Sequence, residues 1–301
     1  MTIMILVIGA TSFIGPAVVE KLLGNNYNVK CLVRTDSNIE KLTRITDDNN
    51  KLKNKKIEFV TGNLQSSDSI FNSLKEIDSA VYLVDIINTN FIKNFLTAIS
   101  KTKIKRAVFL SSTTVLVPLK NKAKDLKLES EDIIKKSNLD YTILRPTMIY
   151  GSRQDRNYSK MINFIKKRGF FIIFGSGNNL IQPIYIGDVA EAVSLVIKNP
   201  KTFKKSYEIC GKEPIKYKDM LEIAKDKLKK PFKIVKLPLK LSKVCVNIYN
   251  KIFPQSELKP DMIERMEIDK AYSYEEASKD FGFSPISFKQ GIDKLIKELK
   301  A

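Results

Sequence analysis

The sequence has 301 residues, of which 43% are hydrophobic, and 52 lysines and arginines outnumber 33 acidic residues to give a net charge of +19. A chain of this length and composition can bury a sizeable core without metal or disulfide support, and the absence of histidine excludes every mechanism that needs an imidazole. Three cysteines at wide, unpatterned spacing argue against a secreted disulfide framework, so we expect a cytoplasmic protein without a membrane span.

The positive charge is carried mostly by lysine, and only 8 of the 52 basic residues are arginine. The lysines are spread along the whole chain, and the accompanying abundance of asparagine and isoleucine is typical of an A+T-rich coding sequence. We therefore predict no nucleic-acid partner, although attraction to a polyanionic partner or to a membrane surface stays open.

Short apolar runs alternate with amphipathic stretches through the first half of the chain. We predict strands at residues 4–8, 28–33, 57–60, 80–84, 106–110 and 141–144. We predict helices between them at residues 13–23, 67–74, 90–101 and 124–136. Buried strands separated by helices of this length are typical of a doubly wound parallel sheet, so we assign the chain to the α/β class.

A glycine-rich turn joins the first predicted strand to the first predicted helix. Gly9, Ser12 and Gly15 have the spacing of a GxxGxxG fingerprint in which serine replaces the middle glycine. Such a turn places the N-terminus of a helix, with its free N–H groups, beside the diphosphate of a dinucleotide. We therefore predict a Rossmann fold that binds its cofactor through this turn, with a plain structural turn as the alternative. The predicted cofactor contacts in the turn are Gly9, Thr11, Ser12, Phe13, Ile14 and Gly15.

The second predicted strand ends in an arginine, Arg34, which lies 19 residues after Gly15. An acidic residue at this distance binds the ribose hydroxyl of NAD, whereas an arginine there suits the 2′-phosphate of NADP. The guanidinium can bind that phosphate bidentately. We therefore predict NADP(H) rather than NAD(H), while Asp36 two residues later and an exposed surface role for Arg34 are the counterarguments.

The alternation of strands and helices weakens after Gly151. We predict a helix at residues 155–167, a strand at 170–174 and a helix at 189–198, followed by a mostly helical remainder interrupted by prolines. This change predicts two domains. A dinucleotide-binding domain covers residues 1–150, and a smaller, mostly helical substrate lobe covers 151–301, with some chain crossing back.

Several motifs in a fixed order carry a resemblance to a known family. They are GATSFIG at 9–15, FLSSTTV at 109–115, LRPTMIYG at 144–151 and QPIYIGDVAEAV at 182–193. Together they resemble the extended and atypical branches of the short-chain dehydrogenase/reductase superfamily, the NAD(P)-dependent epimerase/dehydratase-like proteins. The resemblance covers nearly the whole chain. It implies an oxidoreductase that transfers hydride to or from a nucleotide sugar or a similar small anionic substrate.

The resemblance also implies further cofactor contacts. The residues Gly62, Asn63 and Leu64 look like a GDL motif whose acid contacts adenine, and Asn63 can still hydrogen-bond there. The strand at 80–84 resembles the one that lines the cofactor, and the LRP motif passes the nicotinamide. The contacts implied in this way are Asn63, Leu64, Leu83, Val84, Lys127, Pro146 and Met148.

The family's chemistry uses a tyrosine and a lysine spaced YxxxK, together with a serine or threonine that steadies the substrate oxygen. The resemblance places the threonine at Thr113 and the lysine at Lys127, but the tyrosine position holds Ala123. Either another group transfers the proton, such as Tyr150, Tyr185 or a water on Thr113, or the reaction does not require the phenol, or the protein is a non-catalytic NADP(H)-binding sensor or assembly subunit. A surface lysine and a strand-end threonine are the simpler alternatives for the two residues that are present.

Basic residues gather just after the predicted domain boundary, in GSRQDRNYSKMINFIKK. The extended branch places this stretch near the substrate, where cations suit a diphosphate, although a solvated basic face is the alternative. The implied substrate contacts are Arg153, Arg156, Asn157 and Tyr185. The basic, amphipathic stretch at 238–253 suggests a buried helix of the lobe or, as the alternative, a peripheral membrane contact. We predict no metal, and a monomer or a homodimer paired through the helices at 90–101 and 124–136.

Overall fold

The computed structural model describes residues 3–47, 52, 55, 57–118, 121–155, 157–229, 231–252 and 268–300. The chain forms two compact units, each built from segments that are separated in the sequence. Unit 1 contains Met1–Thr147, Ile186–Ile209 and Ser273–Ser284. Unit 2 contains Met148–Tyr185, Cys210–Tyr272 and Pro285–Ala301. Within the described ranges, no helix is both long enough and apolar enough to cross a membrane.

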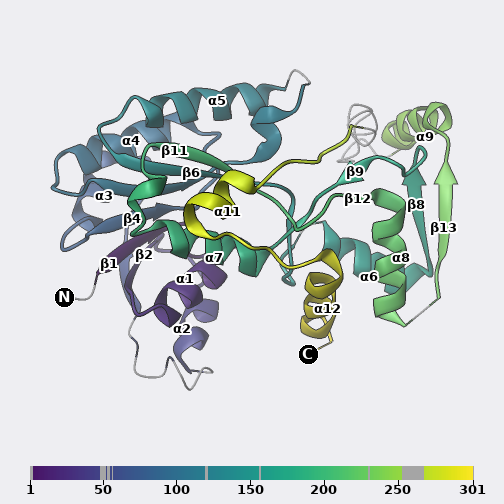
Figure 1. The fold of residues 1–301 in the computed structure, drawn as a ribbon, viewed down its shortest axis with the longest axis horizontal. Helices are drawn as coiled ribbons and strands as arrows, with labels where there is room; N and C mark the ends of the chain where they lie inside the picture. Colours follow the sequence, from purple (N-terminus) through teal and green to yellow (C-terminus); the bar gives the residue numbers. More distant parts are fainter. Residues whose placement is uncertain are drawn as a thin grey trace. The chain divides into compact units, whose positions relative to one another are not determined.

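A parallel sheet of seven strands forms the centre of unit 1 (Figure 1). The strands are β1 (Met4–Ile8), β2 (Asn28–Val33), β3 (Ile57–Thr61), β4 (Ser79–Tyr82), β5 (Arg106–Leu110), β6 (Asp140–Pro146) and β11 (Lys205–Ile209). Their order in the sheet is β11-β6-β5-β4-β1-β2-β3. The chain order reverses between β1 and β4, and ligands of such sheets bind at the carboxyl ends of the strands beside this point.

Helices cover both faces of this sheet (Figure 1). They are α1 (Gly15–Gly24), α2 (Glu40–Asp47), α3 (Ser67–Ser73), α4 (Thr89–Ser100), α5 (Lys122–Lys135), α7 (Ile186–Val196) and α11 (Glu275–Phe281). Helix α1 packs against α2 and α7, while α4 packs against α3 and α5. Because both faces are covered, central strands such as β1 and β4 are largely buried along their length. The rings of Tyr82, Phe95 and Phe109 meet in this core with centroids 5.5 to 5.8 Å apart.

The predicted fold class is confirmed, and the strands predicted in the first half lie within two residues of the observed ones at each end. Among the elements of unit 1, α2 and β11 are missing from the prediction. Strand β11 has the sequence KSYEI and forms the edge of the sheet beside β6. Its polar side chains fit an edge strand, so a search for continuous apolar runs does not detect it. Helix α2 is mostly polar, with Leu42 as its buried residue.

The described part of unit 2 contains four helices and three small two-stranded sheets. The helices are α6 (Tyr158–Arg168), α8 (Tyr217–Leu228), α9 (Leu239–Ile252) and α12 (Phe288–Glu298). The paired strands are β7 (Ile149–Tyr150) with β10 (Ile184–Tyr185), β8 (Phe170–Phe174) with β13 (Lys233–Leu237), and β9 (Leu180–Ile181) with β12 (Ile215–Lys216). Helix α8 packs against α12, and α6 packs against β8.

Aromatic side chains form the centre of unit 2. The ring of Tyr150 is fully buried and lies 5.1 Å from the ring of Tyr158 and 5.2 Å from that of Phe288. Helix α12 comes this close to Tyr150 because it carries Gly291, where a Cβ atom would lie 1.9 Å from the Tyr150 hydroxyl oxygen. Unit 2 therefore has a core of its own, which sets the position of β7 and α12.

Candidate functional site

The turn between β1 and α1 has the backbone that its glycine spacing predicts. Gly9 has a φ of +86°, which favours glycine, and its carbonyl accepts the N–H of Ser12 at 2.9 Å. A Cβ atom at Gly9 would lie 3.0 Å from Cγ2 of Val84, just after β4. A Cβ atom at Gly15 would lie 2.0 Å from the carbonyl oxygen of Ala10, so α1 begins this close to β1 because position 15 is glycine.

No side chain caps the N-terminus of α1, although the N–H of Gly15 donates to the Ser12 carbonyl at 3.2 Å and Pro16 has no N–H. Ile14 is the N-cap residue and makes no side-chain capping bond, and Pro16 lies in the first turn. Ser12 Oγ is buried and has no hydrogen-bond partner among the described residues, while the Thr11 side chain is exposed and Phe13 is half-buried. The unsatisfied Ser12 hydroxyl and the positive end of the helix dipole suit an anion, so this turn fits the diphosphate of the predicted dinucleotide.

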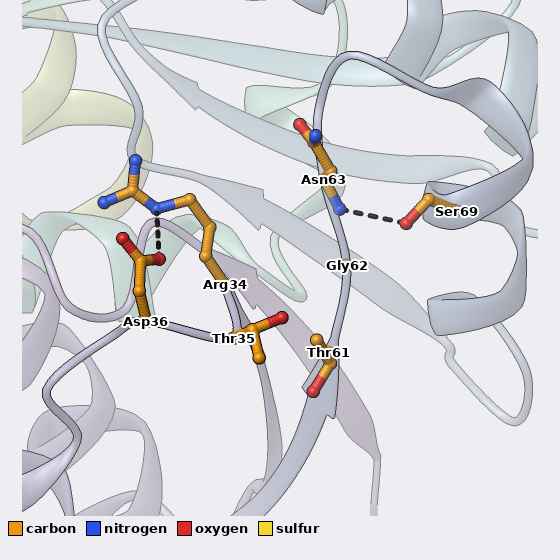
Figure 2. A pocket seen from close by; sticks show the side chains of 7 residues that line it. All are labelled: Arg34, Thr35, Asp36, Thr61, Gly62, Asn63 and Ser69. Carbon is orange, nitrogen blue, oxygen red and sulfur yellow. Dashed lines mark hydrogen bonds and ion pairs between the residues drawn. The ribbon is translucent and has the colours of Figure 1, made fainter.

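A pocket of about 460 Å³ lies at the carboxyl ends of β2 and β3 (Figure 2). Its lining residues are Arg34, Thr35, Asp36, Thr61, Gly62, Asn63 and Ser69. Both Arg34 and Asp36 are largely exposed, and Arg34 Nε lies 3.5 Å from Asp36 Oδ1. An exposed ion pair of this kind is weak, so an incoming phosphate can compete for the guanidinium. The pocket thus has a cation where the prediction needs one for a 2′-phosphate.

The loop after β3 is held by its own polar groups. Ser69 Oγ accepts the backbone N–H of Asn63 at 2.9 Å (Figure 2). Asn63 Oδ1 accepts the backbone N–H of Gln65 at 2.9 Å, and Leu64 packs against the core. The predicted adenine contact of Asn63 therefore depends on its amide nitrogen, which makes a 3.3 Å bond to Gln65.

The segment after β4 and helix α5 bring together an aspartate and a lysine. Lys127 Nζ forms an ion pair with Asp85 Oδ1, and Lys127 is only 8% exposed, so it is not one of the surface lysines of this chain. The carboxylate of Asp85 is more than half exposed. The chain reaches Asp85 through Leu83, which is buried, and Val84, which is half-buried. The sequence prediction missed Asp85, although an acid directly after a buried central strand is a usable signal.

Thr113 and Ala123 lie between β5 and Lys127 in the sequence. Thr113 begins the short 3₁₀ helix Thr113–Leu116 and is buried, with its Oγ1 3.4 Å from the Pro146 carbonyl oxygen. Ala123 lies in the first turn of α5, and its N–H donates to Asn121 Oδ1 at 2.9 Å. This position is one helical turn before Lys127, so the helix has a methyl group where the YxxxK pattern has a phenol.

A buried ion-pair network holds α5 against the sheet. Glu131 lies one turn after Lys127 and is fully buried. Its carboxylate accepts hydrogen bonds from Ser111 Oγ at 2.7 Å and from Arg145 Nε at 3.0 Å, and Arg145 Nη1 donates to Glu208 Oε1 on β11 at 3.0 Å. Burial alone would raise the pKa of Glu131, but the bonds from Arg145 and Ser111 outweigh it and lower this pKa. The network fixes the part of α5 that carries Lys127.

The predicted substrate contacts belong to unit 2, and one of them, Arg156, lies outside the described residues. Arg153 donates through Nε and Nη2 to the carbonyl of the last residue of α12, at 3.1 and 3.0 Å. Asn157 is exposed at the start of α6. Tyr185 is half-buried, and the Nζ atom of Lys294 lies 5.0 Å from the centre of its ring. Their contact with a substrate stays a prediction, and Arg153 already caps α12.

The LRP segment continues from β6 into β7. Pro146 is buried at the end of β6, and the Met148 side chain is about half exposed. Tyr150 follows on β7, fully buried, and its hydroxyl donates to the Phe288 carbonyl at 3.4 Å inside the core of unit 2. A phenol enclosed in this way has no access to a ligand, so Tyr150 is a poor candidate for proton transfer.

Comparison with known proteins adds four findings. The model of the NAD dependent epimerase/dehydratase family matches residues 5–210. The N-acetyl-alpha-D-glucosaminyl-diphospho-ditrans,octacis-undecaprenol 4-epimerase of Escherichia coli O157:H7 is 24% identical, over 97% of this chain and 94% of that protein. The 40 kDa subunit of the mitochondrial NADH-ubiquinone oxidoreductase of Neurospora crassa is 22% identical, over 93% of this chain and 75% of that protein. The crystal structure of a UDP-glucuronic acid 4-epimerase from Bacillus cereus in complex with NAD shares the fold, with a TM-score of 0.75, 19% identity and 99% of both chains covered.

Proposed function

We propose a function from one premise: the chain belongs to the NAD dependent epimerase/dehydratase family, whose model matches residues 5–210. We propose that it binds a nicotinamide dinucleotide and transfers hydride to or from a nucleotide sugar, in an epimerase, dehydratase or reductase reaction. The observation that carries this proposal is the β1–α1 turn. There Gly9 and Gly15 allow a close approach of the backbone, beside the unsatisfied Ser12 hydroxyl and a helix N-terminus that no side chain caps.

The residues of unit 1 fit a dinucleotide along the carboxyl ends of the strands next to the β1–β4 reversal. Gly9 and Ser12 would hold the diphosphate, and Arg34 would hold a 2′-phosphate in the pocket of Figure 2. Lys127 would bind the ribose next to the nicotinamide, with Asp85 keeping its ammonium group in place. Because the pocket is lined by Arg34, we propose NADP(H) as the preferred cofactor rather than NAD(H).

The relatives support a substrate whose sugar is attached to a diphosphate. The Escherichia coli relative is named for an N-acetylglucosaminyl group on a diphospho-lipid, and the Bacillus cereus structure for UDP-glucuronic acid. We propose that this chain takes a nucleotide sugar, with Arg156, Asn157 and Tyr185 of unit 2 among its contacts. A cation at Arg156 would suit the diphosphate, whereas Arg153 would first have to leave the end of α12.

The side chains of unit 1 would orient the sugar and move one proton. When bound, the dinucleotide supplies a hydride acceptor and donor at its nicotinamide ring. Thr113 would orient the reacting oxygen of the sugar. Ala123 stands at the tyrosine position and Tyr150 is enclosed, and among the described residues the acid–base group paired with Lys127 is Asp85. We propose that the substrate O–H bond breaks toward the exposed Asp85 carboxylate, which holds the proton and returns it.

Turnover by the full chain tests the enzyme proposal. The protein, with NADP(H) or NAD(H), is incubated with UDP-glucose, UDP-N-acetylglucosamine and UDP-glucuronic acid, and the sugar products are identified by NMR. We expect conversion of one of these sugars, and a loss of about 100-fold or more in rate for Asp85→Asn and for Lys127→Met. The matched controls are Asp68→Asn on α3 and Lys136→Met just after α5, which are exposed and should leave the rate unchanged.

A second function is favoured by one specific observation, the alanine at position 123. A positioned acid–base group typically contributes about 10²–10⁴ in rate, and the phenol that supplies it in the YxxxK pattern is missing. The similarity to the 40 kDa subunit of a mitochondrial NADH-ubiquinone oxidoreductase supports a chain that binds NADP(H) as a sensor or an assembly subunit. Under this function we expect NADP(H) to raise the Tm of the protein while no sugar is converted. That result would contradict the enzyme proposal and support the cofactor proposal.

We also propose that the protein works in the cytoplasm, as a monomer or a homodimer. Two cysteines lie in the parts of the chain whose burial is described, Cys31 and Cys210, and both are buried and outside any disulfide. Burial raises the pKa of the Cys31 thiol to about 12, which keeps it protonated and unreactive. Buried thiols of this kind are ordinary in a reducing compartment.

A further inference from the structure

A basic and apolar surface belongs to helix α9 of unit 2, outside the site described above. Leu241 and Ile248 are each 54% exposed, Tyr249 is 45% exposed and Ile252 is 64% exposed. We call these four residues the α9 face. Exposed large apolar side chains that gather on one element, rather than scatter singly, mark an interaction site.

The α9 face is one side of an amphipathic helix. Leu241, Ile248 and Ile252 are separated by seven and four residues, which aligns them along one stripe at 3.6 residues per turn. Ser242 and Val246 are buried on the other side, so the helix packs onto unit 2 with a different set of side chains. More than half of each stripe side chain is exposed, so a contact there does not require a change in the burial of Ser242 or Val246.

Lysines and an aromatic ring border the stripe. Lys240 and Lys251 are exposed and lie about a quarter of a turn from it on one side, while Tyr249 lies at a similar angle on the other. Long lysine side chains in this position run their apolar stems along the stripe and keep their charge in water. A tyrosine at the rim, with an apolar ring and a polar hydroxyl, suits the boundary between hydrocarbon and water.

The strand that leads into α9 also exposes both apolar and basic side chains. Figure 1 shows β13 running into α9, and the pair of β13 and β8 exposes Val235 beside Ile172. Lys233 and Lys236 on β13 are exposed as well. Over residues 231–252 the chain has five lysines and no acidic residue. All 33 acidic residues of the chain lie outside this stretch, so its charge is positive throughout.

We propose that the α9 face docks on an anionic membrane surface, with the stripe among the lipid headgroups and the lysines on the lipid phosphates. Charge complementarity selects this occupant. A second copy of the chain, with a net charge of +19, would bring like charges together at the same lysines. An anionic bilayer attracts each lysine, and it can accommodate an apolar stripe of any shape. The proposal goes beyond the function proposed above and does not depend on it.

Flotation of the full chain with lipid vesicles tests this proposal. The vesicles contain phosphatidylcholine alone, or phosphatidylcholine with about one third phosphatidylglycerol. We expect binding to the anionic vesicles at low ionic strength, weaker binding as salt is added, and little binding to the neutral vesicles. Replacing Leu241 and Ile248 by glutamine, or Lys236 and Lys240 by glutamine, should each lower the partition coefficient by about tenfold or more.

Matched variants outside the α9 face serve as controls. Phe59→Gln replaces an exposed apolar residue of β3, and Lys41→Gln with Lys279→Gln removes two exposed lysines of unit 1. These variants should bind vesicles like the unaltered chain, and circular dichroism should show the same helix content in every variant. An equal loss of binding in control and test variants would mean that net charge alone drives the association, and it would overturn the assignment to α9.

Two further results would also overturn it. The first is the absence of binding to anionic vesicles, or equal binding to neutral and anionic vesicles. The second is a concentration-dependent dimer in light scattering that the Leu241 and Ile248 replacements abolish, because a second copy of the chain would then cover the face.

Discussion

Two glycines of the β1–α1 turn are needed for different physical reasons. Gly9 has a φ of +86°, a conformation that side chains with a Cβ atom rarely adopt. Gly15 lies in ordinary helix, but its Cα faces the Ala10 carbonyl at a distance that leaves no space for a methyl group. The first glycine turns the chain, and the second brings the helix N-terminus next to the strand end, where a diphosphate would bind.

Gly15→Ala should lower the free energy of unfolding by about 2 kcal/mol or more, since the new Cβ atom meets backbone that cannot move aside easily. Gly24→Ala at the other end of α1 is the matched control, because nothing lies within 4 Å of a Cβ atom there. That control should leave stability unchanged or raise it by up to about 1 kcal/mol. Urea unfolding of both variants measures the difference, and equal stability of the two would refute the packing role of Gly15.

Arg34→Ala should weaken NADP binding by about tenfold to a hundredfold while NAD binding stays nearly the same, because a guanidinium–phosphate contact is charge-assisted. Arg44→Ala on α2 removes a similarly exposed arginine, paired with Glu40, and should affect neither cofactor. Calorimetric titration with each cofactor gives both constants. An equal loss for NADP and NAD in Arg34→Ala would contradict the preference for NADP.

The sequence predicts candidate site residues whose proposed role depends on local backbone, but it does not predict contacts between residues that lie far apart in the chain. Gly9, Gly15 and Arg34 are recognisable because a strand, a turn and a helix determine their surroundings within a few dozen residues. The pairing of Lys127 with Asp85 joins positions 42 apart in the chain, and no local pattern predicts it. For the same reason the sequence cannot tell that the phenol of Tyr150 lies inside the core of unit 2.

At the scale of elements, helix α5 carries the candidate catalytic lysine and depends on one buried acid for its position. Glu131 receives bonds from the segment after β5 through Ser111 and from β6 through Arg145, which in turn reaches Glu208 on β11. A buried carboxylate without partners would be strongly unfavourable, so the network has to form as a whole. The edge strand β11, which the sequence pattern does not predict, is thus tied to the helix that bears Lys127.

Glu131→Gln should lower the free energy of unfolding at pH 7 by about 3 kcal/mol, because it leaves the half-buried Arg145 with a weaker partner. The pKa of Glu131 is lower in the folded chain than in the unfolded chain, so its stabilising effect is present above about pH 4.3 and is lost as the pH falls through the folded-state pKa. The variant should therefore lose less stability than the unaltered chain on going from neutral to acidic pH.

Urea unfolding over a series of pH values measures this dependence, with Glu129→Gln as the control on an exposed position of the same helix. The control should follow the unaltered chain at every pH. Parallel pH profiles for Glu131→Gln and the unaltered chain would show that the carboxylate charge of Glu131 does not contribute to folding.

At the scale of the whole molecule, the chain has two hydrophobic cores, and the predicted cofactor and substrate contacts lie in different units. One buried cluster lies between the central sheet and helices such as α4, and the other lies among α6, α8 and α12. The predicted diphosphate, 2′-phosphate and ribose contacts belong to unit 1, and the predicted substrate contacts at 153–185 belong to unit 2. Periodicity locates the first core well because its strands are continuous apolar runs, whereas unit 2 is assembled from short strands that carry little pattern.

NADP binding should therefore stabilise unit 1 more than unit 2. At a free NADP concentration of about 100 times Kd, amides that exchange through unfolding of unit 1 should slow by about 100-fold, because ligand bound to the folded form adds to its stability. Amides of α6, α8 and α12 should change little, since their core is separate. Hydrogen exchange followed by mass spectrometry measures both, with Arg34→Ala as a control that removes most of the effect of NADP. Equal slowing in both units would mean that they unfold as one cooperative body, and that the two cores depend on each other.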